Sequence, residues 1–251
     1  MQKISKKMKK IISYPFSILA YLWFLLFICI FHPIQWVCLN VFGYEAHKKS
    51  VDYLNFFLVR TVNFVFSNIE VENRELIPVG KPVIFAANHQ GIFDIIGFAW
   101  FFRKYHPKYV SKIELGKGIP SVSYNLQHGG SVLIDRKDPK QALPALKKMG
   151  EYIETTNRST VIYPEGTRTR DGQPKPFAAN GLKILCKYAP SAYVVPVTIN
   201  NSWKIFKYGN FPLGMGNKIK FTVHPPLKVS DYDFNTLFEK TEQTVVKDIY
   251  K

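Results

Sequence analysis

A histidine and an aspartate five residues apart are the first candidates for chemistry in this sequence. His89 and Asp94 stand in the segment NHQGIFD, residues 88–94, directly after the apolar run of residues 82–87. One turn of chain can bring the two together, so that the carboxylate accepts from one ring nitrogen while the other takes a proton from a substrate hydroxyl. The carboxylate would also stabilise the imidazolium that forms. The alternative is a histidine that only caps a helix.

A nucleophilic serine or cysteine is not indicated. The sequence has no GxSxG pattern, and this favours direct attack by an acceptor hydroxyl over an acyl-enzyme intermediate.

A second polar segment, YPEGTRTR at residues 163–170, also follows a β-branched run. A glycine in a tight turn presents backbone N–H groups, threonine adds a hydroxyl, and arginine supplies a fork that fits phosphate oxygens. The pattern therefore predicts an anion-binding turn, with an ordinary charged turn as the alternative. The candidate binding residues in it are Glu165, Gly166, Thr167 and Arg168.

From residue 68 onward, short apolar runs alternate with helical patterns. Strands are predicted at residues 82–87, 109–113, 131–134, 160–163, 193–199 and 218–224. Helices are predicted at residues 95–103, 140–156, 181–188 and 234–250. This alternation predicts an α/β fold with a mixed sheet flanked by helices, in which functional groups gather at strand ends.

The N-terminal segment is apolar enough for lipid. Residues 11–44 contain no Asp, Glu, Lys or Arg, and the run exceeds both the ~20 residues that cross a bilayer and the ~7–15 of a signal peptide. Pro33 is expected to break or kink the helix. Because lysines flank both ends, we expect a membrane-anchoring helical hairpin at residues 1–67, on the cytoplasmic face of the inner or plasma membrane, before a catalytic domain at 68–251. A single span is the alternative.

The charge balance indicates an anionic partner. The chain has 34 Lys and Arg against 18 Asp and Glu, a formal net charge of +16, which attracts nucleic acid or anionic lipid. The apolar excess at the N-terminus favours membrane lipids over nucleic acid. The three cysteines form no CxxC pair, so neither a disulfide framework nor a zinc site is expected.

The ordered blocks NHQGIFD, KIEL, GSVLIDR, YPEGTR and VVPVTI, between residues 82 and 200, resemble the 1-acylglycerol-3-phosphate acyltransferase family. The resemblance implies an O-acyltransferase that moves a fatty acyl group from acyl-CoA or acyl-carrier protein to the free hydroxyl of a lysophospholipid. The implied acceptor is 1-acylglycerol-3-phosphate, which gives phosphatidic acid, without metal or bound organic cofactor. The family also carries a two-helix N-terminal membrane motif.

The resemblance also implies roles for individual residues. His89 is the general base and Asp94 its partner, while residues 165–168 bind the acceptor phosphate with help from Arg136. Lys112 and the backbone of Gly130 match positions of phosphate or oxyanion contacts.

One departure concerns the acceptor. Family members carry Phe-Lys-x-Gly after the EGTR block, whereas this chain has Phe177-Ala-Ala-Asn-Gly181. The family lysine is therefore absent, and Lys175 and Lys183 are the candidates to replace it. Another lysophospholipid or a lyso-ornithine lipid is an alternative acceptor, and a non-catalytic protein that binds anionic lipid is the alternative from another class.

Overall fold

The computed structural model describes residues 6–135 and 138–249. The helices are α1 Lys6–Phe42, α2 Tyr44–Val59, α3 Ile92–Phe101, α4 Val122–His128, α5 Pro139–Thr156, α6 Ala179–Tyr188 and α7 Phe234–Lys247. The strands are β1 Asn68–Glu72, β2 Val83–Ala87, β3 Pro107–Lys112, β4 Val132–Ile134, β5 Ser159–Ile162, β6 Tyr193–Asn200, β7 Lys218–Val223 and β8 Leu227–Lys228.

The strands form one mixed sheet in the order β1-β7-β6-β2-β5-β3-β4, and β8 pairs with β6. The strands β6, β2, β5, β3 and β4 are parallel, whereas β7 and β8 run antiparallel to β6. The carboxyl ends of β2, β5 and β3 therefore meet at one edge, where ligands bind in open α/β sheets. The predicted α/β fold with a mixed sheet is confirmed.

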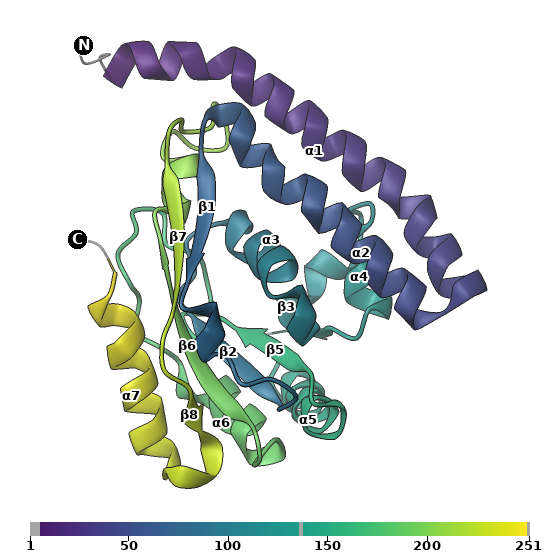
Figure 1. The fold of residues 1–251 in the computed structure, drawn as a ribbon, viewed down its shortest axis with the longest axis vertical. Coiled ribbons are helices and arrows are strands. Elements are labelled where there is room, and N and C mark those ends of the chain that lie inside the picture. Colours follow the sequence, from purple (N-terminus) through teal and green to yellow (C-terminus); the bar gives the residue numbers. More distant parts are fainter. Residues whose placement is uncertain (1–5, 136–137, 250–251) are drawn as a thin grey trace.

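Helices cover both faces of this sheet (Figure 1). Alternate residues of β2 divide between the two sides, because successive side chains of a strand point to opposite faces. Phe85 belongs to the core that includes α3 and the N-terminal helices. Ile84 belongs to the core beneath α5, α6 and α7. Since all of β2 is buried, its carboxyl end is held firmly from both sides.

The N-terminal helices form the predicted hairpin, but the expected break at Pro33 is wrong. Helix α1 continues through Pro33 to Phe42, and the chain reverses at Gly43, whose φ of 79° suits glycine. Proline is tolerated in lipid-facing helices where neighbours supply hydrogen bonds. The carbonyl that loses its partner at Pro33 is that of Cys29, and next to it the Ser121 hydroxyl donates to the carbonyl of Ile28 over 2.6 Å.

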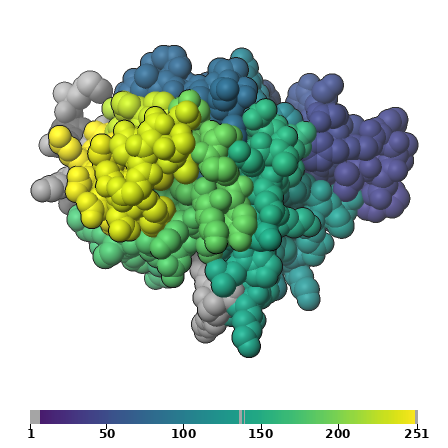
Figure 2. Space-filling view, turned by 90° about the horizontal axis from the view of Figure 1, so that it is seen from below, coloured from purple at the N-terminus to yellow at the C-terminus, as the bar shows by residue number. Residues whose placement is uncertain are grey.

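Helix α1 has the polarity of a membrane helix. Its fully buried side chains include Ser13, Ser17 and Gln35, whereas large apolar side chains are exposed along the opposite face. A surface helix in water shows the reverse arrangement. Figure 2 shows this N-terminal segment, in purple, standing out on the side away from the yellow C-terminal helix. Residues 7–42 are also long and apolar enough to cross a bilayer. The chain therefore associates with a membrane.

The remaining elements follow the predicted pattern, with some additions. Each predicted strand and helix is present with ends shifted by a few residues, while β1, β8 and α4 were not predicted. The division of the chain at residues 67 and 68 stays a prediction, and hairpin residues such as Leu54 and Leu58 pack in the same core as β2.

Helix α3 approaches the sheet at Gly97. A Cβ atom at this position would lie 2.5 Å from Cζ of the fully buried Phe221. We expect Gly97→Ala to lower the free energy of unfolding by about 1–3 kcal/mol through overpacking, and Phe221→Leu in the same chain to recover part of the loss. Urea unfolding of the detergent-solubilised protein measures both. A Gly97→Ala protein with the wild-type midpoint would contradict this packing.

Candidate active site

The segment after β2 is tied to the neighbouring strand β6 by Asn88. Its side-chain amide donates to the carbonyl of Ile199 over 2.8 Å, and its oxygen accepts from the Ile199 N–H over 2.7 Å. Both residues are buried. This pair of bonds fixes the backbone immediately before His89.

His89 and Asp94 lie in direct contact. The Nδ1 atom of His89 is 2.8 Å from Oδ2 of Asp94, which is fully buried. The same oxygen accepts from the backbone N–H groups of Gln90 and Gly91, over 2.6 and 2.8 Å, at the start of α3. With the carboxylate accepting from Nδ1, the ring keeps Nε2 free to take a proton. The arrangement therefore suits a general base.

Glu165 holds the backbone of His89 from the other side. Its two carboxylate oxygens accept from the N–H groups of His89 and Lys175, over 2.9 and 3.2 Å. Burial raises the pKa of Glu165 to about 7, against the opposite effect of these N–H groups. The sequence placed Glu165 among the acceptor-binding residues. Because its oxygens are engaged with backbone groups, we assign it to positioning His89.

Two further contacts complete the support of His89. The N–H of Thr169 donates to the His89 carbonyl over 2.8 Å. The ring of Tyr163 stacks on the imidazole, with centroids 4.1 Å apart and planes 15° from parallel. The segment of residues 163–169 thus binds the backbone and one ring face of His89, so the two predicted motifs form a single unit.

The exposed side chains near His89 are basic or polar. Gly166, with φ of 72°, turns the chain and donates to the Tyr163 carbonyl, and the exposed Thr167 and Arg168 follow. Lys112 ends β3. The pairing of β3 with β5, and of β5 with β2, places it level with Asn88 two strands away. A phosphate near His89 would meet several cations from this edge.

Gly130, another predicted site residue, lies away from His89. Gly130 comes two residues before Val132, which pairs with Val110, so it lies level with Lys108 and well below His89 along the sheet. A Cβ there would lie 3.4 Å from Cε of Lys108. The register does not bring Gly130 to His89. Arg136 lies outside the described residues.

The structure separates the two candidate substitutes for the absent family lysine. The ammonium group of Lys175 donates to the carbonyl of Arg168 over 3.3 Å, beside the predicted anion-binding turn. The ammonium group of Lys183 instead lies over the ring of Phe234, 5.7 Å from its centroid, on the far face of the sheet. Only Lys175 stands near the site.

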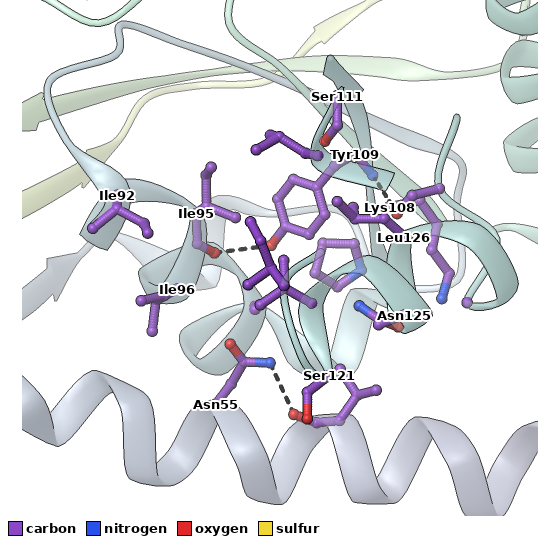
Figure 3. A pocket seen from close by; sticks show the side chains of 18 of the residues that line it. Asn55, Ile92, Ile95, Ile96, Lys108, Tyr109, Ser111, Ser121, Asn125 and Leu126 are labelled. Atoms are coloured by element: carbon purple, nitrogen blue, oxygen red, sulfur yellow. Dashed lines mark hydrogen bonds between the residues drawn. The ribbon is translucent and has the colours of Figure 1, made fainter. Parts of the chain in front are cut away.

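A cavity of about 590 Å³ opens beside His89 and runs beneath the hairpin. Its apolar wall includes Ile92, Ile95, Ile96 and Tyr109, as Figure 3 shows, and residues of α2 and α4 also line it. Thr167 and Arg168 line its mouth. No local pattern in the sequence indicates this cavity, because its walls come from segments that only the fold brings together.

Comparison with known proteins identifies relatives along most of the chain. A family model described as Acyltransferase matches residues 68–200. The chain is 30% identical over 191 residues to the 1-acyl-sn-glycerol-3-phosphate acyltransferase of Helicobacter pylori, a match covering 75% of this chain and 76% of the relative. It is 27% identical over 171 residues to the chloroplastic 1-acyl-sn-glycerol-3-phosphate acyltransferase BAT2 of Brassica napus, over 68% of this chain. That match spans only 48% of the plant protein, about half its length.

A solved structure shows the same fold. The crystal structure of the 1-acyl-sn-glycerophosphate (LPA) acyltransferase PlsC from Thermotoga maritima superposes with a TM-score of 0.75, covering 98% of this chain and 96% of that one. The two sequences are 22% identical, so this likeness concerns the fold.

The raised pKa of Glu165 predicts a pH-dependent stability. Folded Glu165 binds its proton up to a pH of about 7, whereas an unfolded glutamate releases it near 4.3. Between these values the folded state binds more protons, so this group makes the protein less stable as pH rises, by up to about 3 kcal/mol. Glu165→Gln removes the effect. We therefore expect the difference in unfolding free energy between wild type and Glu165→Gln to change across this window, and a constant difference would contradict it.

Proposed function

This chain belongs to the acyltransferase family, as its ordered sequence blocks predicted, and on that basis we propose that it acylates the free hydroxyl of a lysophospholipid. The acyl donor is a thioester, acyl-CoA or acyl-carrier protein. The acceptor is 1-acylglycerol-3-phosphate and the product phosphatidic acid. The observation that carries the proposal is the contact between His89 and Asp94 at the mouth of a largely apolar cavity.

His89 acts as the general base in this reaction. Its Nε2 takes the proton of the acceptor hydroxyl as the oxygen attacks the thioester carbonyl, which forms the new C–O bond. The tetrahedral intermediate then collapses, the C–S bond breaks, and the imidazolium returns the proton to the departing thiolate. Asp94 stabilises the imidazolium between the two steps. Because the carboxylate is buried and held by backbone N–H groups, the ring does not need to reorient.

The acceptor phosphate binds at the basic edge of the sheet. Arg168 supplies a planar fork, and Thr167 and the backbone after Gly166 add further donors. Lys112 and Lys175 contribute positive charge, and Lys175 takes the place of the family lysine that this sequence lacks. This arrangement supports a phosphate-bearing acceptor over a neutral lysolipid.

The transferred acyl chain occupies the cavity, since its apolar wall begins beside His89. The hairpin lies in the cytoplasmic leaflet, so that lysophospholipid reaches His89 from the membrane. Helix α1 supports this placement, because its outer face is apolar while its inner face packs on α2 and on residues near Leu213. The flanking lysines favour the cytoplasmic side for both ends.

His89→Ala is expected to lower kcat by the ~10²–10⁴-fold typical of losing a general base, while membrane attachment persists. Asp94→Asn is expected to be similarly severe, because an amide does not stabilise the imidazolium as a carboxylate does. Initial rates with acyl-CoA and 1-acylglycerol-3-phosphate measure both. The exposed His128 provides the control, and His128→Ala should retain the wild-type rate. Near-normal turnover by His89→Ala would overturn His89 as the general base, whereas a wild-type protein without turnover would favour the lipid-binding alternative.

Arg168→Ala is expected to lower kcat/KM about ten- to hundredfold for 1-acylglycerol-3-phosphate, mainly through KM, because a charge-assisted pair contributes about 1.5–3 kcal/mol. Arg168→Lys should restore only part of this, since a point charge lacks the fork. Arg170→Ala is the matched control, because that arginine is exposed two residues further on and does not line the cavity. An equal loss of kcat/KM with a neutral lysolipid would show that Arg168 does not recognise the phosphate.

A further inference from the structure

The inner part of the cavity is lined by polar side chains that an ordinary acyl chain cannot satisfy. Gln35 of α1 is fully buried, and neither its amide nitrogen nor its amide oxygen has a hydrogen-bond partner among residues 6–135 and 138–249. His47 of α2 is 1% exposed, and its Nε2 likewise has no partner within the described chain. Both residues line the cavity. We call Gln35, His47, His106 and Lys108 the polar recess.

These residues come from three segments that the fold brings together. Phe27 of α1 stacks on Phe57 of α2, at 3.9 Å between ring centroids. Counting back along the antiparallel hairpin puts Gln35 opposite residue 49, within one turn of His47. Lys108, 7% exposed on β3, lies close enough for its charge to help lower the pKa of His47 and of His106.

The recess is polar, and the charged side chains beside it, Lys48 and Asp52, form an ion pair with each other. Burial lowers the pKa of His47 and of His106 to about 4 and that of Lys108 to about 7. At neutral pH both imidazoles are therefore uncharged, and each can donate or accept a hydrogen bond. An unsatisfied buried amide or imidazole costs about 1–3 kcal/mol. A ligand with a neutral oxygen would remove this cost, whereas a terminal methyl group would leave it in place.

The recess lies about one acyl chain away from the catalytic pair. Lys108 is level with Thr160 on β5, which is level with Ile84 on β2. Ile84 precedes His89 by five residues, about 16 Å along a strand, and β3 lies two strands, about 10 Å, to the side, so Lys108 is roughly 19 Å from His89. An extended acyl chain has a similar length, since one chain spans half of the ~30 Å hydrocarbon core of a bilayer. A chain whose carbonyl lies at His89 would place its distal end at the recess.

We propose that the cavity selects acyl donors that carry an oxygen, such as a hydroxyl group, near the distal end of the chain, and that Gln35 and His47 recognise it. The inference rests on the proposed function and specifies its acyl substrate. Gln35 offers a donor and an acceptor, and neutral His47 offers one ring nitrogen, so together they match a hydroxyl that donates one hydrogen bond and accepts another.

Competition between matched thioesters tests the proposal. Plain and terminally hydroxylated dodecanoyl-, tetradecanoyl- and hexadecanoyl-CoA are supplied in pairs with 1-acylglycerol-3-phosphate, and the ratio of kcat/KM is measured for each pair. We expect the wild-type enzyme to prefer the hydroxylated donor about three- to tenfold at one or more of these lengths, as one or two buried hydrogen bonds would produce.

Two variants locate the preference. Gln35→Leu should abolish it without lowering the unfolding midpoint, because replacing an unsatisfied amide by an apolar group of similar shape is neutral or stabilising. Asn55→Leu is the matched control, since Asn55 lines the same cavity but its amide already donates to the Val51 carbonyl over 2.8 Å. The dashed line that starts at the Asn55 amide in Figure 3 marks this bond. Asn55→Leu should keep the preference, and its loss there, or a large loss of stability in Gln35→Leu, would overturn the assignment.

Other outcomes separate this inference from the proposed function. Equal use of plain and hydroxylated donors by an active wild-type enzyme would overturn the recess and leave acyl transfer intact. A preference for a hydroxyl on the chain of the acceptor would assign the cavity to the acceptor and overturn the proposal as stated. If no thioester is used, the failure concerns the proposed function. Displacement of a fluorescent fatty acid by plain and hydroxylated free acids then decides whether the recess binds a hydroxyl.

Discussion

The two hydrogen bonds accepted by the buried carboxylate of Glu165 are the contacts on which the site depends most. It accepts from the backbone of His89 at the end of β2 and from that of Lys175 beyond the anion-binding turn. A carboxylate with little access to water is costly to keep ionised, and the raised pKa of Glu165 reflects that cost. The fold tolerates this cost because one side chain joins the base to the turn. Without this link, His89 would be held only by Asp94, by the ring of Tyr163, and by the backbone bonds at Asn88 and Thr169.

The N-terminal hairpin serves two purposes at once. Its outer face is apolar and exposed, as lipid requires, while its inner face closes the cavity that begins at His89. In the proposed function, membrane attachment and substrate binding therefore share the same two helices. A substitution on the inner face of α1 changes the cavity wall, whereas one on the outer face changes the contact with lipid. The hydrophobic effect and the shape of the binding site are thus coupled through α1 and α2.

Charge is distributed along the cavity in the order that the proposed reaction needs. The mouth carries exposed cations, including Lys112 and Arg168, which retain their hydration until an anion binds. The wall beside His89 is apolar, and the inner recess holds polar groups that burial keeps close to neutral. A substrate with an anionic head, an apolar chain and a distal oxygen would satisfy all three zones.

The sequence by itself determined the elements and residues whose signals are local. Alternating apolar runs predicted the strands, because a buried parallel strand needs such residues wherever it lies, and the short spacing between His89 and Asp94 predicted their contact. Pro33 shows the limit of local rules, because helix α1 continues through it to Phe42.

Contacts between distant segments were decided only by the tertiary structure. Gly130 belongs to the GSVLIDR block and was predicted to lie in the site, yet the register of β3 and β4 places it beside Lys108. The same holds for the choice of Lys175 over Lys183, for the backbone bonds of Glu165, and for the cavity under the hairpin. No spacing along the chain encodes these contacts, because each depends on how strands, helices and loops far apart in the sequence pack against one another.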